Sequence, residues 1–393
     1  MSKNLAVAAA VAVLLAACGG SDDHPAPLAP VAQLFAQTND TNNMVVHYLR
    51  NADGSLVPQA PVGTGGKGTN GVNYFMGNAV GPDALTSNHS VVVSDDGRQL
   101  FVANAGDNTV SVFSIAQAGG LTLQAVSPTG GIQPTSLAFN AGVLYVTHQR
   151  GVNELGAYRV GSDGKLTALG QYPILQQDAL PTEVSVSPDH KYVVVNGFLS
   201  ALTPTTPGNT LLAYPINGDG TLGKAVTSAT VGVGPFGGVF GHGAQAGTYV
   251  TADAAGTTAT SYSFSAGGAF SALSGPVKVT GQTAPCWIAI TPDNRFVYVS
   301  NGSGTISLFA LDAAGKLTLV NATAASEPSI KAGASSFAAD AWISPDGKFL
   351  YQDYAGNDKI IVYAIGADGA LTRTGEQMVG TKTGISLQGA AGI

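Results

Sequence analysis

The stretch ISPDGKFLY, residues 343–351, has the form of a β-hairpin: an apolar approach, a Ser-Pro-Asp-Gly reversal and an alternating strand. Proline restricts φ and glycine permits positive φ, and a tight reversal needs both conformations. Near-copies recur as VSDDGRQLFV (93–102), VSPDHKYVVV (186–195) and ITPDNRFVYV (290–299). The recurrence indicates a repeated unit in which each copy needs the same reversal between its innermost strand and the next.

A second motif allows the units to be counted. It is a glycine turn followed by an apolar residue, and its copies lie 45 to 65 residues apart. They end at Leu56, Leu121, Leu166, Leu222, Phe270, Leu317 and Leu371. From the second copy onward, each turn follows three short apolar segments, so a unit contains four strands, which is typical of a propeller blade rather than of a helical solenoid. The sequence therefore predicts an all-β, seven-bladed β-propeller over residues 31–393.

We expect segments from both ends of the chain to form the first blade together. The first unit has strands around AQLFAQTN, MVVHYLRN and SLVPQAP but lacks an innermost strand, and the chain ends with the apolar segment GISLQGAAGI, residues 384–393. We expect this C-terminal strand to complete the first blade, which closes the ring and removes exposed sheet edges.

Two segments depart from the repeat. Residues 63–88, between the first and second blades, contain GTGGKGTNGVNYFMGN, whose GTGGKG lacks the ending and the strand-to-helix context of a phosphate-binding P-loop. Residues 198–209 carry several threonines and prolines, and we interpret them as an ordered surface loop.

The N-terminus is interpreted as a targeting segment. Thirteen apolar residues, 5–17, are too few for a membrane span of about 20 residues but suit a secretory signal. The tetrad Leu-Ala-Ala-Cys ending at Cys18 resembles the lipobox of bacterial lipoproteins, which implies a signal peptide over residues 1–17 and acylation of Cys18. Residues 18–30 would then be a flexible tether. Gly19 in place of aspartate suggests the outer membrane, facing the periplasm.

Composition limits the remaining function classes. A formal charge of −7 provides no basic surface for nucleic acid. Once Cys18 is lipidated, Cys286 is the single remaining cysteine, so no intramolecular disulfide forms. We expect Cys286 to be a buried structural thiol rather than a nucleophile.

Several of these segments resemble a known family. ISPDGKFLY, VSDDGRQLFVAN, NTVSVFSI and SDGKLTAL are similar to seven-bladed lactonase-type propellers, which include 6-phosphogluconolactonase-like, carboxymuconate-cyclase-like and YVTN-repeat proteins. Members of the family carry histidines and charged residues around one channel mouth, often as Pro-His at the start of inner strands. In this chain the inner strands start with NHS, QPTS, LPTE, GPFG and APCW. Among these starts only NHS, which contains His89, approaches the family pattern, and no Pro-His pair occurs.

Aligning the reversals places one residue of each inner strand at an equivalent position near the channel mouth. These residues are Ser90, Ser136, Glu183, Gly237, Trp287 and Asp340. The carboxylates of Glu183 and Asp340 could activate water or hold a divalent cation such as calcium. The structural alternative is that both accept hydrogen bonds from backbone N–H groups in the loops above them.

The second strands end at another equivalent position, which holds Asn104, His148, Asn196 and Asn301. The asparagines are interpreted as turn formers. His148 and Arg150 break the pattern and, with Glu183, form the predicted catalytic cluster, since histidine can transfer a proton and arginine can bind an anion. A solvated loop or a local salt bridge is the structural alternative for His148 and Arg150. His89, Asp340, Trp287 and Tyr74 are the expected substrate contacts.

The family resemblance implies hydrolysis of a lactone. In such a reaction we expect Glu183, helped by His148, to activate water and Arg150 to hold an anionic group of the substrate. Export favours an unphosphorylated sugar lactone. The alternative is a non-catalytic scaffold that binds a protein or glycan of the envelope. In either case we expect a monomer that meets the membrane only through its lipid anchor, with no cofactor unless a cation lies near Glu183 and Asp340.

Overall fold

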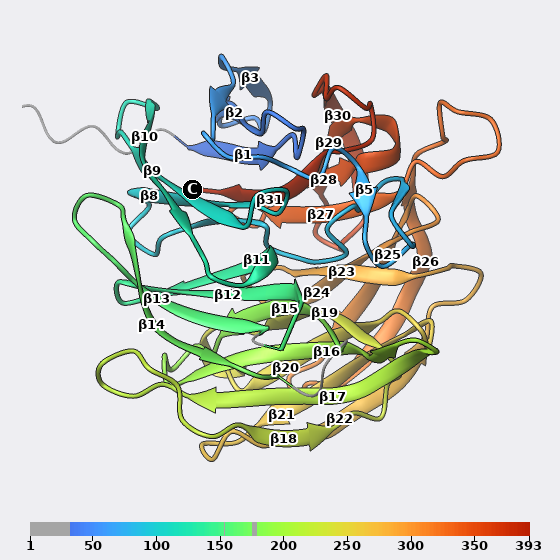
Figure 1. Cartoon of the computed structure of the whole chain (residues 1–393). Coiled ribbons are helices and arrows are strands. Elements are labelled where there is room, and N and C mark those ends of the chain that lie inside the picture. Colours follow the sequence, from blue (N-terminus) through green and yellow to red (C-terminus); the bar gives the residue numbers. More distant parts are fainter. Residues whose placement is uncertain (1–31, 153, 175–178) are drawn as a thin grey trace, which may run out of the picture.

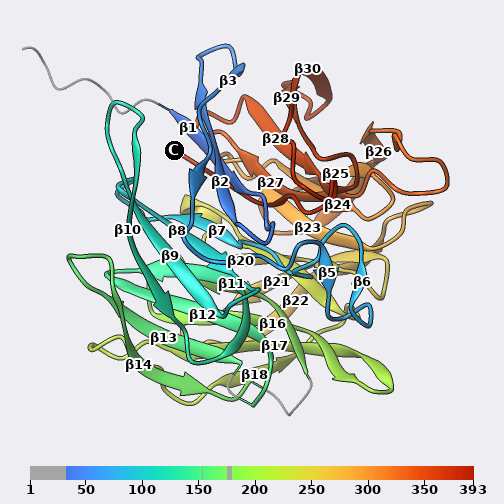
Figure 2. The same cartoon turned by 45° about the horizontal axis from the view of Figure 1, so that its top comes forward.

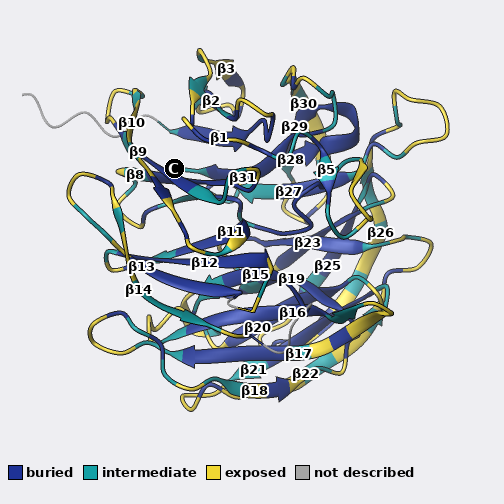
Figure 3. Ribbon diagram, in the orientation of Figure 1, coloured by how far each residue is buried: buried dark blue, intermediate teal, exposed yellow. Residues whose placement is uncertain are grey.

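The structure is a computed structural model that describes residues 32–152, 154–174 and 179–393. The predicted signal peptide, the lipidation site Cys18 and the tether at 18–30 lie outside the described residues. The described residues form seven blade sheets arranged around one axis and one separate two-stranded sheet, with the strands largely buried and the connecting loops exposed (Figures 1 and 3). The predicted seven-bladed propeller is therefore confirmed.

Blades 2 to 4 are four-stranded antiparallel sheets, each described here from the axis outward. Their strands are β7 (Val91–Val93), β8 (Gln99–Asn104), β9 (Thr109–Ile115) and β10 (Leu121–Pro128); β11 (Ile132–Asn140), β12 (Val143–Arg150), β13 (Leu155–Val160) and β14 (Leu166–Tyr172); and β15 (Leu180–Val186), β16 (Tyr192–Leu202), β17 (Thr205–Pro215) and β18 (Val226–Ala229).

Blades 5 to 7 repeat this order. Their strands are β19 (Pro235–Phe240), β20 (Thr248–Asp253), β21 (Thr258–Phe264) and β22 (Phe270–Lys278); β23 (Pro285–Ile290), β24 (Phe296–Asn301), β25 (Thr305–Leu311) and β26 (Leu317–Ser326); and β27 (Ala338–Ile343), β28 (Phe349–Tyr354), β29 (Lys359–Ile365) and β30 (Leu371–Met378). Two 3-10 turns, η1 (Gly243–Gln245) and η2 (Ala355–Asn357), occur in blades 5 and 7. In the part of the chain that the structure describes, no helix is long and apolar enough to cross a bilayer.

The first blade is built from both ends of the chain. It contains β1 (Gln33–Gln37), β2 (Met44–Arg50), β3 (Leu56–Pro58) and β4 (Val62–Gly63), with β31 (Gln388–Gly392) as its innermost strand. β31 pairs antiparallel with β1, and Figure 1 shows the dark red C-terminal strand beside the blue N-terminal one. Two backbone hydrogen bonds, 3.1 and 3.0 Å long, join Gln33 and Ile393. The predicted ring closure is confirmed.

The recurring Ser-Pro-Asp-Gly reversal is held by the same hydrogen bonds in each copy. In blade 7, Ser344 Oγ donates to Asp346 Oδ1 (2.6 Å) and accepts the Phe349 N–H (3.0 Å). Asp346 Oδ1 also accepts the Lys348 N–H (3.2 Å), and Gly347 takes a φ of +69°. Equivalent bonds form in blades 2, 4 and 6, so the serine or threonine and the aspartate are needed to build the turn.

The glycine turns recur because they connect neighbouring blades. Tyr351 in blade 7 donates its hydroxyl to the Gly54 carbonyl of blade 1 (2.9 Å), and Tyr298 in blade 6 donates to Gly369 of blade 7 (2.8 Å). A Cβ on Gly54 would lie 2.3 Å from the Phe349 ring, so the tight contact requires glycine. Apolar side chains fill the remaining space between blades, and each fully buried Val, Leu, Ile or Phe contributes roughly 1.5–3 kcal/mol.

The two departures from the repeat take different forms. Residues 63–88 run over one face and include a short hairpin of β5 (Val72–Asn73) and β6 (Ala79–Val80), seen at the front of Figure 2. Residues 198–209 were predicted to be a loop, and this prediction is wrong. β16 and β17 extend through most of this segment as a paired hairpin, with Leu199 opposite Pro207 and Leu202 opposite Thr205, because the alternating apolar residues continue the strand pattern.

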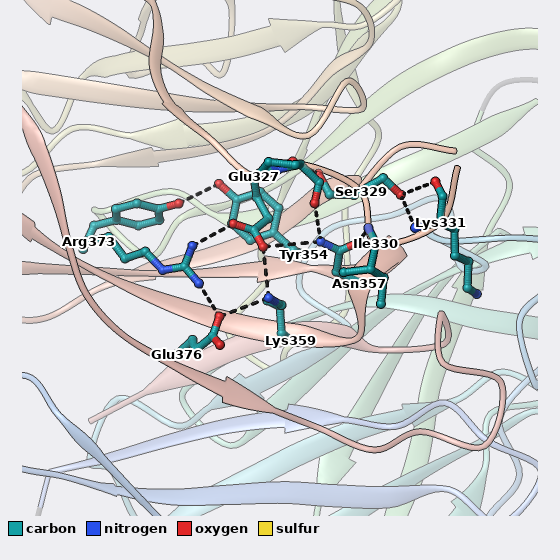
Figure 4. Close-up of polar contacts among 12 residues, drawn as sticks. Glu327, Ser329, Ile330, Lys331, Tyr354, Asn357, Lys359, Arg373 and Glu376 are labelled. Atoms are coloured by element: carbon teal, nitrogen blue, oxygen red, sulfur yellow. Dashed lines mark hydrogen bonds and ion pairs between the residues drawn. The ribbon is translucent and has the colours of Figure 1, made fainter. Parts of the chain in front are cut away.

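A charged network ties the loop between blades 6 and 7 to blade 7 (Figure 4). Glu327, whose side chain is 6% exposed, binds Lys359 Nζ through Oε1 (2.9 Å) and Arg373 through Oε2 (2.8 Å). Glu376, on β30, pairs with the same two cations. Asn357 Nδ2 donates to the Pro328 carbonyl and Asn357 Oδ1 accepts the Ile330 N–H, so the loop is held from both sides.

We predict that Glu327→Gln lowers the free energy of unfolding by roughly 3 kcal/mol, the low end of the range for breaking a buried ion pair, because Glu376 still pairs with both cations. Guanidinium denaturation followed by tryptophan fluorescence measures the change. As a control, Lys165→Gln removes a pair between exposed side chains, Lys165 and Asp163, and should leave the midpoint unchanged. An unchanged midpoint for Glu327→Gln would contradict the assigned role.

Candidate functional site

The loop between blades 1 and 2 sends a segment across the propeller axis. We call residues 82–89 the axis segment. Ser87 Oγ donates to the Thr135 carbonyl of blade 3 (2.9 Å), and the Asn88 N–H donates to the Thr182 carbonyl of blade 4 (2.9 Å). From blade 6, Trp287 Nε1 donates to the Ser87 carbonyl (3.0 Å). Because these partners belong to inner strands of different blades, the axis segment closes the channel near one end.

The backbone of the axis segment is locally strained and is held by side chains. Asp83, Thr86 and His89 all have positive φ, at 52°, 45° and 57°. Such conformations cost of order 1–3 kcal/mol each and persist only where the surroundings impose them. Asn73 Nδ2 supplies two restraints, donating to the Asp83 carbonyl (2.7 Å) and to Thr86 Oγ1 (3.0 Å), while Gln149 Nε2 donates to the Thr86 carbonyl (3.2 Å).

His89, the last residue of the axis segment, lies between two buried carboxylates. Its Nδ1 is 3.5 Å from Glu183 Oε1, and its backbone N–H donates to Asp340 Oδ1 (3.3 Å). The His89 side chain is 42% exposed, whereas that of Glu183 is 1% exposed. The imidazole is therefore the group through which these carboxylates can act on a molecule in the channel.

The carboxylates also join successive blades. Glu183 Oε2 accepts the Gly238 N–H of the next inner strand (2.8 Å), and Asp340 Oδ2 accepts the Gly389 N–H (3.0 Å). Ser136 Oγ of blade 3 likewise accepts the Val184 N–H of blade 4 (3.0 Å). Both carboxylates thus accept backbone N–H groups, but Gly238 and Gly389 lie on the inner strands β19 and β31, and only the His89 N–H comes from a loop as expected. Glu183 Oε1 and Asp340 Oδ1 are the oxygens nearest His89.

The surroundings shift the protonation of this cluster. Burial lowers the pKa of His89 to about 4, so its imidazole is neutral at neutral pH and has a nitrogen free to accept a proton. Burial raises the pKa of Glu183 well above its usual value and raises the pKa of Asp340 to about 7. A neutral imidazole with a free nitrogen can accept a proton, as a general base must, and Glu183 Oε1 lies 3.5 Å from Nδ1 without a hydrogen bond to it.

The exposed side of His89 faces a hollow of about 420 Å³ on the axis, which we call the axial hollow. Inner-strand residues of blades 5, 6 and 7 form most of its wall. The lining includes Val239, Ile288, Ile290, Ala341, Trp342 and Ile343, with His242 and Pro345 from the loops. Of the described residues that line the hollow, none is a lysine or an arginine.

The predicted cluster of Glu183, His148 and Arg150 is not formed. The His148 side chain is buried, with Nε2 2.9 Å from Thr129 Oγ1, and the Arg150 guanidinium lies over the Tyr74 ring at 4.4 Å. Among the described residues, no hydrogen bond or ion pair joins Glu183 to either of them. The physical reason is strand alternation, because the Glu183 side chain points toward blade 5 whereas His148 belongs to blade 3.

Two expected substrate contacts have structural roles instead. Trp287 is almost fully buried between Phe236 and Phe337, at ring distances of 5.2 and 5.6 Å, so it presents no surface to a substrate. Tyr74 is half-buried and one face of its ring is covered by Arg150. Of the four expected substrate contacts, only His89 has an exposed side chain that lines the axial hollow. Asp340 is buried and accepts the backbone N–H of His89.

Sequence reasoning missed the pairing of His89 with Glu183. The available signal was the position of His89 at the end of the long loop, immediately before Ser90, where the extra residues can reach the axis. His242, to which the sequence assigned no role, also lines the axial hollow.

Cys286 is buried, and burial raises the pKa of its thiol well above the usual value. Within the described ranges, no group of three or more His, Cys, Asp or Glu is arranged to hold a metal ion.

Comparison with known proteins places this geometry in context. The 6-phosphogluconolactonases of Pectobacterium carotovorum and Pectobacterium atrosepticum are 26% and 27% identical to this chain over 297 and 301 residues. Each alignment covers 72% of this chain and 82% of the relative. A solved structure described as the periplasmic gluconolactonase of Pseudomonas aeruginosa matches with a TM-score of 0.68 over 89% of this chain and 97% of that chain. Its 18% identity establishes likeness of fold alone.

The model of the family described as "Lactonase, 7-bladed beta-propeller" matches residues 50–153 and 133–386. Together these ranges cover all strands of blades 2 to 7, the axis segment, and β3 and β4 of blade 1. With the observed closed ring of seven sheets, they establish that the chain belongs to the lactonase family of seven-bladed β-propellers.

Proposed function

We propose that this protein hydrolyses a lactone in the axial hollow, with His89 as the general base. The observation that carries the proposal is the position of His89, half exposed in the hollow with Glu183 behind it. Glu183 is too buried to reach a water directly, so we assign it a positioning role in place of the direct activation expected from sequence.

In the proposed reaction the free imidazole nitrogen of His89 takes a proton from a water molecule, and the resulting hydroxide oxygen bonds to the ring carbonyl carbon. The tetrahedral intermediate then collapses as the bond between that carbon and the ring oxygen breaks. The protonated His89 returns its proton to the ring oxygen, which leaves as an alcohol, and the product is a hydroxy acid. Glu183 and Asp340 hold the imidazole side chain and the His89 backbone in place.

The lining of the hollow favours a neutral lactone. A phosphorylated substrate would need a cation, and arginine or lysine is the usual partner of phosphate, yet the described lining contains neither. Trp342 offers an aromatic surface against which a sugar ring can pack. The Pectobacterium relatives are named for a phosphorylated lactone, so we propose that this chain differs from them in substrate.

We also propose that the protein works in the bacterial cell envelope as a lipid-anchored monomer, on the outer membrane facing the periplasm. The support is the lipobox-like sequence that ends at Cys18 and follows a secretory-type apolar run.

We predict that His89→Asn lowers kcat on a responsive neutral lactone by roughly 10²–10⁴-fold, the usual contribution of a general base. Asparagine tolerates the positive φ at this position. His190→Asn is the matched control, since His190 also has positive φ but lies in the reversal between β15 and β16, outside the lining of the axial hollow, and it should retain full activity. Hydrolysis is measured across a panel of neutral and phosphorylated lactones. Undiminished turnover in His89→Asn would contradict the role of His89, and no turnover by the wild type would favour the non-catalytic scaffold.

The pH profile gives a second readout of the same assignment. Because burial lowers the pKa of His89, the imidazole stays neutral as pH falls through 6.5, and kcat/KM should drop only as pH approaches about 4. Burial raises the pKa of Asp340 to about 7, so Asp340 also titrates in this range, and the profile is compared with that of Asp340→Asn. A drop near the ordinary histidine value in both proteins would show that the imidazole is not held as described.

For the anchor, we predict that Cys18→Ala moves the protein from the membrane fraction to the soluble fraction in a bacterial host, because the acyl chains are its expected attachment. Fractionation followed by immunoblotting measures the shift. Retention of the variant in membranes would contradict the assignment of Cys18.

A further inference from the structure

A second cavity, of about 390 Å³, lies at the opposite end of the inner strands from the axial hollow. We call it the loop cavity. Its wall includes residues at the starts of inner strands, whereas the axial hollow is lined by the later parts of the same strands. Asp83 and Thr86 line the loop cavity and His89 lines the hollow, so the axis segment separates the two spaces.

The loop cavity is lined mainly by apolar side chains and has a fixed roof. Phe198, Phe236, Phe337, Ala254 and Cys286 form the body of the wall. The β5–β6 hairpin covers it, because Phe75 from this hairpin packs edge-on against Phe198 with ring centroids 5.7 Å apart. The roof is anchored further by Asn73 to the axis segment and by Arg150 against Tyr74. The cavity is therefore formed before any molecule enters.

Among the buried polar side chains of this wall, that of Asp83 has an oxygen without a hydrogen-bond partner in the described part of the chain. Asp83 is 5% exposed, and its Oδ1 has no hydrogen-bond partner among the described residues. Leaving such a group unpaired costs roughly 1–3 kcal/mol, which a bound molecule could recover. Burial raises the pKa of Asp83 well above its usual value, and the nearby Asp340 adds to the shift. The raised pKa favours the protonated carboxyl group, whose O–H is a donor.

The rim of the loop cavity provides a route of entry. Met76 and Val80 line it and are each 61% exposed, although large apolar side chains are usually covered in a monomer. Both residues belong to the hairpin region that forms the roof. Apolar groups at the entrance favour an apolar molecule over a charged one.

We propose that the loop cavity binds a neutral, apolar small molecule that carries one hydrogen-bond acceptor, which pairs with Asp83. Its volume suits a ligand of about 12–17 non-hydrogen atoms, such as an aromatic or aliphatic ketone or ester. The proposal does not rest on lactone hydrolysis, because the axis segment separates the loop cavity from His89.

The test uses 6-propionyl-2-dimethylaminonaphthalene, a neutral fluorophore with one ketone whose emission moves to shorter wavelength in apolar surroundings. We expect saturable binding of one molecule per chain with a blue shift. Ala254→Phe fills the cavity and should weaken binding by about tenfold or more, since the probe loses its contact space. Ala118→Phe, in an exposed turn on the outside of blade 2, is the matched control and should bind as the wild type does.

A matched pair of ligands tests the role of Asp83. 2-Acetylnaphthalene and 2-ethylnaphthalene have similar shapes, but only the first has an acceptor. We expect the ketone to displace the fluorophore at about a tenfold lower concentration, the effect of one hydrogen bond to a buried group. Non-saturable binding, or equal binding by Ala254→Phe, would overturn the site, and equal displacement by the two naphthalenes would overturn the pairing with Asp83. Lactone turnover of Ala254→Phe should match that of the wild type, so loss of the site and loss of the proposed enzyme activity are distinguishable.

Discussion

The hydrogen bonds that hold residues 82–89 across the axis are the constraint on which the rest of the site depends. Partners on blades 3, 4, 6 and 7 hold the backbone at Ser87, Asn88 and His89, so one short segment joins more than half of the ring. The segment divides the axial space into two compartments of different character. One contains the imidazole of His89, and the other contains the carboxyl group of Asp83 in an apolar wall.

The ring that surrounds this segment is stabilised by repetition. Each reversal is built by a serine or threonine and an aspartate, and several tyrosines connect one blade to the glycine turn of the next. The two ends of the described chain are joined within blade 1 by the pairing of β31 with β1. A closed ring with fixed blade positions allows a strained segment such as residues 82–89 to be held in place, because the cost of its positive-φ residues is offset by contacts on all sides.

The sequence was sufficient to predict the fold because the motifs that define it are local. The Ser-Pro-Asp-Gly turn at 344–347 and the turn that ends at Leu56 involve residues close in the chain, and their spacing gives the number of blades. The partner of Glu183 could not be found in this way, since the direction of its side chain depends on strand alternation relative to blade 5. His89 reaches Glu183 through a loop without a repeat pattern, so only the folded chain brings them within 3.5 Å.

Hydrogen exchange of the backbone amides, resolved to single residues, tests most directly whether the axis segment is an integral part of the propeller. The Asn88 amide donates to Thr182, and the Leu137 amide donates to His89. We expect both amides to exchange as slowly as that of Val184 on a neighbouring inner strand, because all three can open only when the ring opens. If Asn88 instead exchanges as fast as Gly77 in the exposed hairpin turn, the segment moves independently of the ring and the account of both cavities fails.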